Sequence, residues 1–202
     1  RSLNYALQCG TIKENKIANY KVKEKPYNRQ ILTNEEVKNI EFSTLNNETL
    51  NEIKDIFLFC CYTGLSYSDI KSLSIDDIRI INDRKWIVKN RAKTNIEFSI
   101  PIISKAIIIL NKYSTANSHL LLPVRSNQKM NKHLKTIAVI CKINKPISMH
   151  IARHTFATTI ALENNVPIET VSKVLGHTNL STTQIYGKIL RKKIEKDFEN
   201  LM

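Results

Sequence analysis

The chain has 202 residues, of which 42% are hydrophobic and 24% are charged. This composition excludes wholesale disorder and indicates one folded domain, with at most a fragment of a second. Its 31 lysines and arginines outnumber 18 aspartates and glutamates, which gives a net charge of +13. Such an excess on a small domain favours a polyanionic partner, first of all nucleic acid, although a surplus that only aids solubility is the plainer alternative.

No part of the sequence points to a membrane or to secretion. The longest apolar run, Ile56 to Tyr62, is far shorter than the ~18 residues of a membrane helix. No signal peptide is visible and the first residue is Arg1, so we expect a piece of a longer protein. The four cysteines form no C-x-x-C pair, which favours buried free thiols in a reducing cytoplasm over disulfides or a zinc site. They are Cys9, Cys60, Cys61 and Cys141.

Residues 1–30 differ from the rest of the chain. Arg1 to Cys9 has the character of a helix end, and Gly10 would stop it. A polar, lysine-rich stretch follows, which we interpret as a linker that either tracks a phosphate backbone or is simply solvated. Its candidate DNA-contacting residues are Lys21, Lys23, Lys25 and Arg29.

The remaining residues, 31–202, predict a mainly α fold with a small antiparallel β-sheet. Thr33 to Glu36 is a capping box that starts a helix. Three period-2 segments predict the sheet, with turns at Asn82-Asp83 and at Lys93 to Asn95. These strands are expected at 77–81, 85–89 and 96–100. Further helices are expected at 47–63, 66–73, 104–113, 127–141, 149–163, 167–175, 182–188 and 190–201.

The stretch from Ser148 to Tyr186 carries most of the candidate chemistry. Ser148 is a good N-cap and would place His150 and Arg153 in the first two turns of a helix. These two side chains and His154 fall within an arc of roughly 100°, so that an imidazole and a guanidinium could grip one anion. The plainer alternative is a polar helix face with one satisfied histidine.

Three further features add to this set. Gly176 in Leu175-Gly176-His177 would end a helix in the left-handed conformation and fix the direction of His177. Ser181 to Gln184 is a second capping box and would start a short helix with Tyr186. Arg91 and Lys93 lie at the tip of the second hairpin. Together these groups could surround a phosphodiester while a tyrosine attacks it. The plainer interpretations are a capping histidine, a packing tyrosine and a solvated lysine.

In this order, the motifs resemble the catalytic domain of tyrosine recombinases of the phage integrase type, including integrases of conjugative and mobilisable elements. The matching motifs are Thr63-Gly64-Leu65, Arg91-x-Lys93-Thr94, His150-x-x-Arg153-His154, Leu175-Gly176-His177 and Tyr186. The resemblance spans residues 31–202, and residues 1–30 resemble the end of the core-binding domain with the basic linker. It implies a site-specific recombinase that cleaves and rejoins DNA through a 3′-phosphotyrosine, without metal, ATP or another cofactor.

The resemblance also implies a role for each matching residue. Tyr186 would attack the scissile phosphate, Arg153 and His177 would bind it, and His150 would assist the tyrosine. Lys93 would protonate the leaving 5′-oxygen. Asp69 would support the pocket, with Ser66 and His154 as further supporting positions.

One position departs from the family pattern. The first motif normally reads T-G-L-R, and its arginine binds phosphate, whereas this chain has Ser66. Losing one charged donor at such a site costs ~3 kcal/mol of transition-state stabilisation. Arg91 and Arg125 are the candidates to compensate and to contact DNA. The alternative is a weakened or inactive DNA-binding relative.

We expect double-stranded DNA as the partner, a homo-tetramer on paired sites and a location in the bacterial cytoplasm, at the nucleoid. The last expected helix carries an apolar stripe that could dock on a neighbouring copy or pack in cis. The stripe is Leu190, Ile194, Phe198 and Leu201. A metallo-hydrolase using His150 and His154 is a further alternative, but it lacks the Glu of H-E-x-x-H and an evident third ligand.

Overall fold

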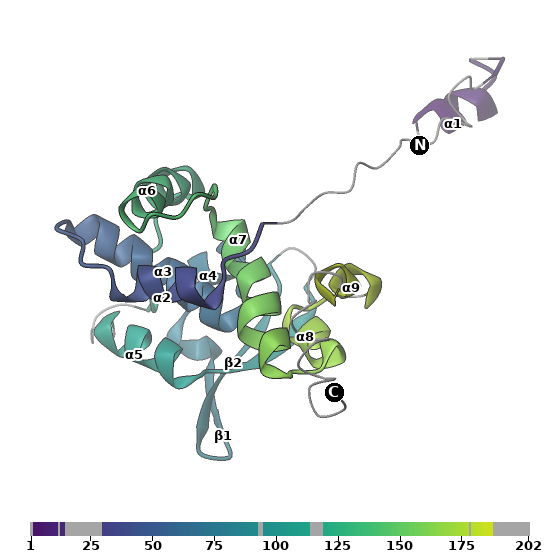
Figure 1. The fold of residues 1–202 in the computed structure, drawn as a ribbon. Coiled ribbons are helices and arrows are strands. Elements are labelled where there is room, and N and C mark those ends of the chain that lie inside the picture. Colours follow the sequence, from purple (N-terminus) through teal and green to yellow (C-terminus); the bar gives the residue numbers. More distant parts are fainter. Residues whose placement is uncertain are drawn as a thin grey trace, which may run out of the picture.

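The computed structural model describes residues 2–11, 13–14, 30–92, 95–113, 119–177 and 179–187. The fold is mainly helical with one small sheet, as the sequence predicts (Figure 1). The α-helices are α1 (Ser2–Gln8), α2 (Asn34–Phe42), α3 (Glu48–Thr63), α4 (Tyr67–Lys71), α5 (Ser104–Tyr113), α6 (Asn127–Ile140), α7 (Met149–Thr155), α8 (Ile168–Val174) and α9 (Ser181–Gly187). The strands are β1 (Ile78–Ile81), β2 (Arg84–Asn90) and β3 (Glu97–Pro101), and the short helical turns are η1 (Ile75–Asp77), η2 (Phe156–Ala161) and η3 (Leu162–Asn164).

Helix α3 is the centre of the main hydrophobic core. Every residue from Ile53 to Leu65 is buried. A helix that is buried all round needs cover on every side, and α2, α5, α6, α7 and η2 supply it (Figure 1). The buried carboxylate of Asp55 ties α5 to this core, because it accepts hydrogen bonds from Lys112 Nζ at 2.6 Å and from the Tyr113 hydroxyl at 2.7 Å.

The sheet has the order β1-β2-β3 with both pairs antiparallel. The β1–β2 turn contains Asn82 and Asp83 with φ of 48° and 58°, as expected for a tight hairpin turn with two left-handed residues. In β3 the side chains alternate, and Phe98 and Ile100 enter the core. The chain leaves β2, the central strand, at Arg91, so the end of this strand brings the arginine into the interior.

The segment 149–163 was expected as one helix and contains three hydrogen-bonding patterns. Helix α7 continues into the π-helical η2 and then into the 3₁₀ turn η3. Threonines hold the wider turns. Thr155 Oγ1 accepts from the Leu32 N–H at 3.1 Å, and Thr159 Oγ1 donates to the Leu32 carbonyl at 2.6 Å. The start of the folded domain is therefore fastened to the helix that carries His150 and Arg153.

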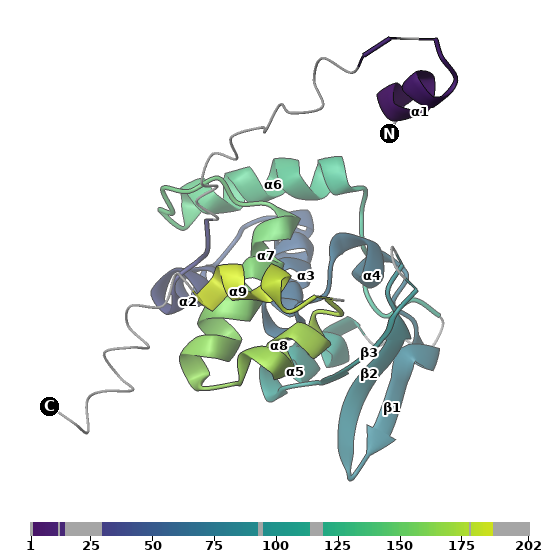
Figure 2. The same cartoon turned by 90° about the vertical axis from the view of Figure 1, so that its right-hand side faces the viewer.

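Tyr186 belongs to a second, smaller hydrophobic cluster. Helix α9 packs on α8 and on η2 (Figure 2). The cluster consists of Ala157, Ala161, Leu162, Val171, Leu175 and Tyr186. The element that carries the tyrosine is thus attached to a satellite of the core rather than to its centre.

Two glycines bring distant segments together. Gly64 has φ +70°, ends α3, and a Cβ there would lie 2.5 Å from Phe156 Cδ1. Gly176 has φ +60°, and a Cβ there would lie 2.8 Å from Arg91 Nε. The Gly176 and His177 N–H groups donate to the Lys173 and Ser172 carbonyls, which forms the expected left-handed cap of α8.

The two predicted capping boxes have different outcomes. The first is confirmed, because Thr33 Oγ1 accepts from the Glu36 N–H at 3.2 Å and Glu36 Oε2 accepts from the Thr33 N–H at 2.8 Å. The second is wrong. Helix α9 already begins at Ser181, whose N–H donates to Asn179 Oδ1 at 3.0 Å, so the capping side chain comes from two residues earlier.

The cysteine prediction holds in part. Cys60, Cys61 and Cys141 are buried free thiols, whereas Cys9 is exposed and the expectation was wrong for it. No helix among the described residues is long and apolar enough to cross a membrane. Residues 15–29 of the linker expected at 13–29 lie outside the described residues, as does the expected last helix at 190–201.

Candidate active site

A buried ion pair lies at the base of the site. Asp69 of α4 accepts from Arg91 Nη1 at 2.6 Å and from the Ala92 N–H at 3.1 Å, and both side chains are at most 5% exposed. Arg91 also stacks on the Phe98 ring, 3.6 Å from its centroid, and donates to the Val174 carbonyl. Arg91 was expected at a hairpin tip, in a position to contact a phosphate. It is instead buried, because Asp69, Phe98 and the end of α8 all engage its guanidinium.

Ser66 is engaged by the same carboxylate. It is the N-cap of α4, and its Oγ donates to Asp69 Oδ2 at 2.7 Å and accepts from the Asp69 N–H at 3.3 Å. Burial alone would raise the pKa of Asp69, but the hydrogen bonds from Ser66 and from the Ala92 N–H, with the charge of Arg91, outweigh it and lower this pKa. Asp69 is therefore ionised at neutral pH.

Arg153 of α7 lies next to this pair. Its Nη1 donates to the Gly64 carbonyl at 2.9 Å, and its Nη2 donates to the Leu175 carbonyl. Among the described residues it has no salt-bridge partner. Burial, and the positive charge of Arg91, lower the pKa of Arg153 to about 10. The site thus holds two neighbouring guanidinium groups and one carboxylate.

The tyrosine reaches the same helix at His154. The Tyr186 hydroxyl lies 2.7 Å from His154 Nδ1, and Tyr186 is only 1% exposed. The His154 ring meets the His150 ring edge to face, with centroids 4.2 Å apart. His154 was expected to share a polar face with His150 and Arg153. It is instead 3% exposed, because it faces the Tyr186 cluster.

His177 is held by the helix that carries the tyrosine. Its Nδ1 lies 2.7 Å from Oγ1 of Thr183, which is fully buried one turn before Tyr186. Helix α9 therefore meets two imidazoles of the site, His154 through Tyr186 and His177 through Thr183. Thr183 was missed at the sequence level, where it was only an interior member of the expected capping box.

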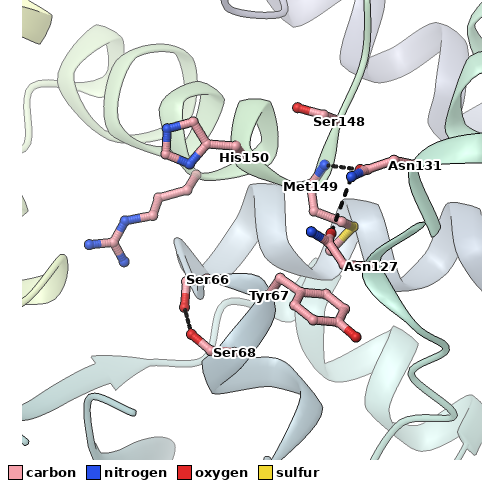
Figure 3. A pocket seen from close by; sticks show the side chains of 9 residues that line it. Ser66, Tyr67, Ser68, Asn127, Asn131, Ser148, Met149 and His150 are labelled. Carbon is pink, nitrogen blue, oxygen red and sulfur yellow. Dashed lines mark hydrogen bonds between the residues drawn. The ribbon is translucent and has the colours of Figure 1, made fainter. Parts of the chain in front are cut away.

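A polar cleft of about 280 Å³ opens beside Arg153 (Figure 3). Its lining comes from the start of α4, from α6 and from the first turns of α7. In Figure 3, Ser66 and Ser68 lie on one side, Asn127 and Asn131 on another, and His150 on α7. Hydroxyl, amide, imidazole and guanidinium groups around one cleft can all donate to phosphate oxygens.

Several expected site residues are not part of this arrangement. Arg125 forms an ion pair with Glu52 at 2.6 Å at the protein surface, and its carbonyl accepts from the Tyr67 hydroxyl. Lys93, the expected general acid, lies outside the described residues, two positions after Arg91. The linker residues Lys21, Lys23, Lys25 and Arg29 also lie outside them.

The prediction for the start of α7 is confirmed in position but not in its capping bond. Ser148 occupies the N-cap position but makes no side-chain capping bond. The Met149 N–H instead donates to Asn131 Oδ1 of α6 at 2.9 Å. A contact between residues 18 positions apart leaves no local pattern, so the sequence offered no signal for it.

The sequence model of the family described as the phage integrase family matches residues 30–192. The chain belongs to the phage integrase family. Its structure is similar to that of the XerA recombinase (TM-score 0.69, 17% identity, covering 98% of this chain and 81% of the other). It is also similar to a lambda integrase dimer bound to a COC′ core site (TM-score 0.73, 15% identity, covering 92% and 68%).

This phage integrase family member also has curated relatives. It is 28% identical over 153 residues to the tyrosine recombinase XerD of Pseudomonas putida, covering 69% of this chain and 49% of XerD. It is 30% identical over 177 residues to the tyrosine recombinase XerA of Pyrococcus horikoshii, covering 83% and 60%. The chain thus spans about half to three fifths of the length of these relatives.

The metallo-hydrolase alternative gains no support from the histidines. Within the part of the chain that the structure describes, no group of three or more His, Cys, Asp or Glu side chains is arranged to hold a metal ion. His154 instead contacts Tyr186.

We predict that Asp69→Asn destabilises the domain in a pH-dependent way. The change leaves Arg91 buried without its counterion, which costs ~3 kcal/mol of unfolding free energy at pH 7. Because folding lowers the pKa of Asp69 below its ordinary value of about 3.9, its stabilisation is present above that pH and is lost as pH falls through the folded pKa. Urea unfolding at several pH values should show the wild-type and variant curves converging below about pH 4.

Glu52→Gln is the matched control, because it removes the carboxylate of the half-exposed pair with Arg125. This variant should lower the free energy of unfolding by less than ~1 kcal/mol. Equal losses of unfolding free energy in the two variants would contradict the assigned role of the buried pair. A loss of unfolding free energy in Asp69→Asn that does not change with pH would contradict it as well.

Proposed function

We propose that this chain is the catalytic part of a site-specific DNA recombinase, which cleaves and rejoins strands through a covalent 3′-phosphotyrosine. Family membership supports the reaction class. The observation that carries the proposal is the contact of the Tyr186 hydroxyl with His154, in a helix that also presents His150 and Arg153. A nucleophile, imidazoles and guanidinium groups from separate elements thus meet in one region.

The proposed step is a transesterification. The Tyr186 oxygen attacks phosphorus, an O–P bond forms and the bond to the 5′-oxygen breaks. The phenol proton passes to an imidazole, with His154 in direct contact and His150 next to it. Lys93 donates its own ammonium proton to the leaving 5′-oxygen. The phosphotyrosine keeps the energy of the diester, so that a second 5′-hydroxyl reseals the strand without ATP or a metal ion.

The two arginines would stabilise the charge that develops on the phosphate. Arg153 donates to two backbone carbonyls here, and hydrogen bonds to an anion are about twice as strong as such neutral ones. A phosphate in the adjoining cleft can therefore replace them. With a pKa of about 10, Arg153 remains protonated at neutral pH. His177 would add a further hydrogen-bond donor.

Attack also requires Tyr186 to leave its buried position. The side chain is 1% exposed and its hydroxyl points to His154 rather than into solvent. Because α9 rests on the satellite cluster, its displacement leaves the main core around α3 intact. We propose that DNA binding by the assembled protein provides this displacement.

We further propose that Arg91 replaces the arginine that Ser66 does not supply. The charge of Arg91 reaches Arg153, since it contributes to the lowered pKa of that group. The two guanidinium groups donate to neighbouring carbonyls at the end of α8, those of Val174 and Leu175. Within the described residues the Nε of Arg91 finds no acceptor, so one donor is uncommitted. Arg125 is occupied by Glu52 and lies outside this group.

The remaining expectations belong to the same proposal. The family match begins at residue 30, where the expected linker ends, which supports a division into residues 1–30 and a catalytic domain at 31–202. The similar lambda integrase dimer bound to a core site supports double-stranded DNA as the partner, and a recombinase relative in a bacterium supports a location in the bacterial cytoplasm, at the nucleoid. Phosphate contacts from Lys21, Lys23, Lys25 and Arg29 remain a prediction.

A groove of about 360 Å³ supports the proposed assembly. It lies between the sheet, the end of α3, η2 and α8, and its apolar lining includes Tyr62, Trp86, Ile100, Phe156, Val171 and Val174. Within the described residues the Trp86 indole N–H has no acceptor. We propose that the apolar stripe of residues 190–201 of a neighbouring copy docks here, which would link Tyr186 to tetramer formation on paired sites.

We predict that Tyr186→Phe abolishes covalent adduct formation, because it removes the attacking oxygen. The assay joins the chain to any preceding region that its gene encodes, and offers a pool of nicked duplexes with randomised arms. The wild type should give a slow-migrating protein–DNA band on a denaturing gel, and the variant at least ~1,000-fold less of it. DNA binding without adduct in the wild type would favour the inactive DNA-binding alternative.

We predict that Arg91→Lys slows adduct formation by ~10- to 100-fold, because lysine keeps the charge but cannot bond Asp69, α8 and a phosphate at once. Arg125→Lys should change the rate less than ~2-fold, since that side chain is at the surface. Thermal unfolding would confirm that both variants fold. A larger loss of rate in Arg125→Lys than in Arg91→Lys would assign the compensating role to Arg125.

We predict that a peptide of residues 188–202 binds a chain shortened after Lys188. The chain has a single tryptophan, so the fluorescence of Trp86 reports occupancy of the groove directly. A saturable change in emission is expected, and a control peptide with Phe198→Asp should give none. An unchanged spectrum with the unaltered peptide, or tetramers on DNA without residues 189–202, would rule out this docking.

A further inference from the structure

Asn131 joins two helices that both border the cleft. Its Oδ1 accepts from the Met149 N–H at 2.9 Å, and its Nδ2 donates to Asn127 Oδ1 at 3.2 Å (Figure 3). The assignment of the amide is fixed by chemistry, because a backbone N–H can only donate and so requires the oxygen. The side chain is thus held at both ends, by α7 and by the preceding turn of α6.

The bond to Met149 meets a need of α7. The first N–H groups of a helix have no partner within it, and a buried N–H without an acceptor is costly. Met149 is only 2% exposed, and Ser148, the local candidate for the cap, does not supply the bond. Asn131 supplies it from another helix, so the first turn of α7 depends on the position of α6.

Helix α6 is a firm base for this contact. Met130 directly precedes Asn131, and Leu134 follows it about one turn later. Both side chains are fully buried and hold α6 against the main core. Ser126 caps the start of α6 by accepting from the Lys129 N–H. The helix can therefore transmit the position of the core to Asn131 and onward to Met149.

His150 directly follows the residue that Asn131 holds. It is exposed beside the cleft, and its ring contacts the ring of His154, which in turn contacts Tyr186. An error in the first turn of α7 would move His150 relative to the phosphate and the tyrosine. Misplacement by about 1 Å can cost ~100-fold in rate.

We propose that Asn131 is a positioning residue of the reaction: from α6 it fixes the first turn of α7 and thereby places His150 at the cleft. This role rests on the proposed recombinase function. Its action is indirect, because the amide oxygen and one amide hydrogen are already engaged by Met149 and Asn127.

The test measures the rate of adduct formation against DNA concentration. Asn131→Ala removes the acceptor and should lower the maximal rate by ~10- to 100-fold, with the half-saturating DNA concentration changed less than ~3-fold. Asn131→Asp keeps an acceptor for the Met149 N–H and should retain most of the maximal rate. Its added negative charge should instead raise the half-saturating concentration.

Gln128→Ala is the matched control, because it removes an exposed amide from the same helix outside the cleft lining. It should leave the maximal rate unchanged. Amide hydrogen exchange in the absence of DNA should show faster exchange at Met149 in Asn131→Ala and near wild-type exchange in Asn131→Asp.

Four outcomes would overturn the proposal. A loss confined to the half-saturating concentration in Asn131→Ala would make Asn131 a DNA contact. Equal rates for Asn131→Ala and Asn131→Asp would show that the acceptor is irrelevant. A wild type that forms no adduct would overturn the proposed function and this role with it, whereas an active wild type with an equally active Asn131→Ala would overturn this role alone.

Discussion

The carboxylate of Asp69 holds together three segments that are far apart in the sequence. It caps the start of α4 through Ser66, pairs with Arg91 at the end of β2, and through Arg91 reaches the last carbonyl of α8. A buried guanidinium is tolerated only with a counterion and well-placed acceptors, and this one has both. The Asp69–Arg91 pair fixes the end of β2 beside α8. Arg153 lies next to this pair and donates to the following carbonyl, that of Leu175.

This arrangement explains how the domain keeps cationic groups close together without DNA. Arg153 donates to carbonyls at the ends of α3 and α8, where helix C-termini concentrate negative partial charge. The imidazoles of His154 and His177 meet hydroxyl groups on α9. Each of these partners is weaker than a phosphate anion, so the protein's own contacts prepare the groups without competing strongly with a substrate.

Local patterns predicted most of the fold because their causes are local. Apolar periodicity located the helices and strands to within a few residues, and Gly176 ended its helix with the left-handed φ that was expected. The motif order also singled out the helix of His150 and Arg153 together with Tyr186, and the two elements meet at His154. The features that the sequence did not predict depend on distant partners. The burial of Arg91 requires Asp69, and the bond at the start of α7 requires Asn131. The π-helical turn is stabilised by Leu32. No window of sequence contains both members of these pairs.

The sheltered phenol of Tyr186 has a consequence for a cell that carries such a protein. With 1% of its surface open, the nucleophile has no route to a phosphate while α9 stays on its satellite cluster. In the proposed reaction, a solitary molecule on ordinary chromosomal sequence would therefore leave that DNA intact. Strand breakage would then require the proposed assembly, so the same packing that buries the tyrosine would also protect the genome against stray nicks.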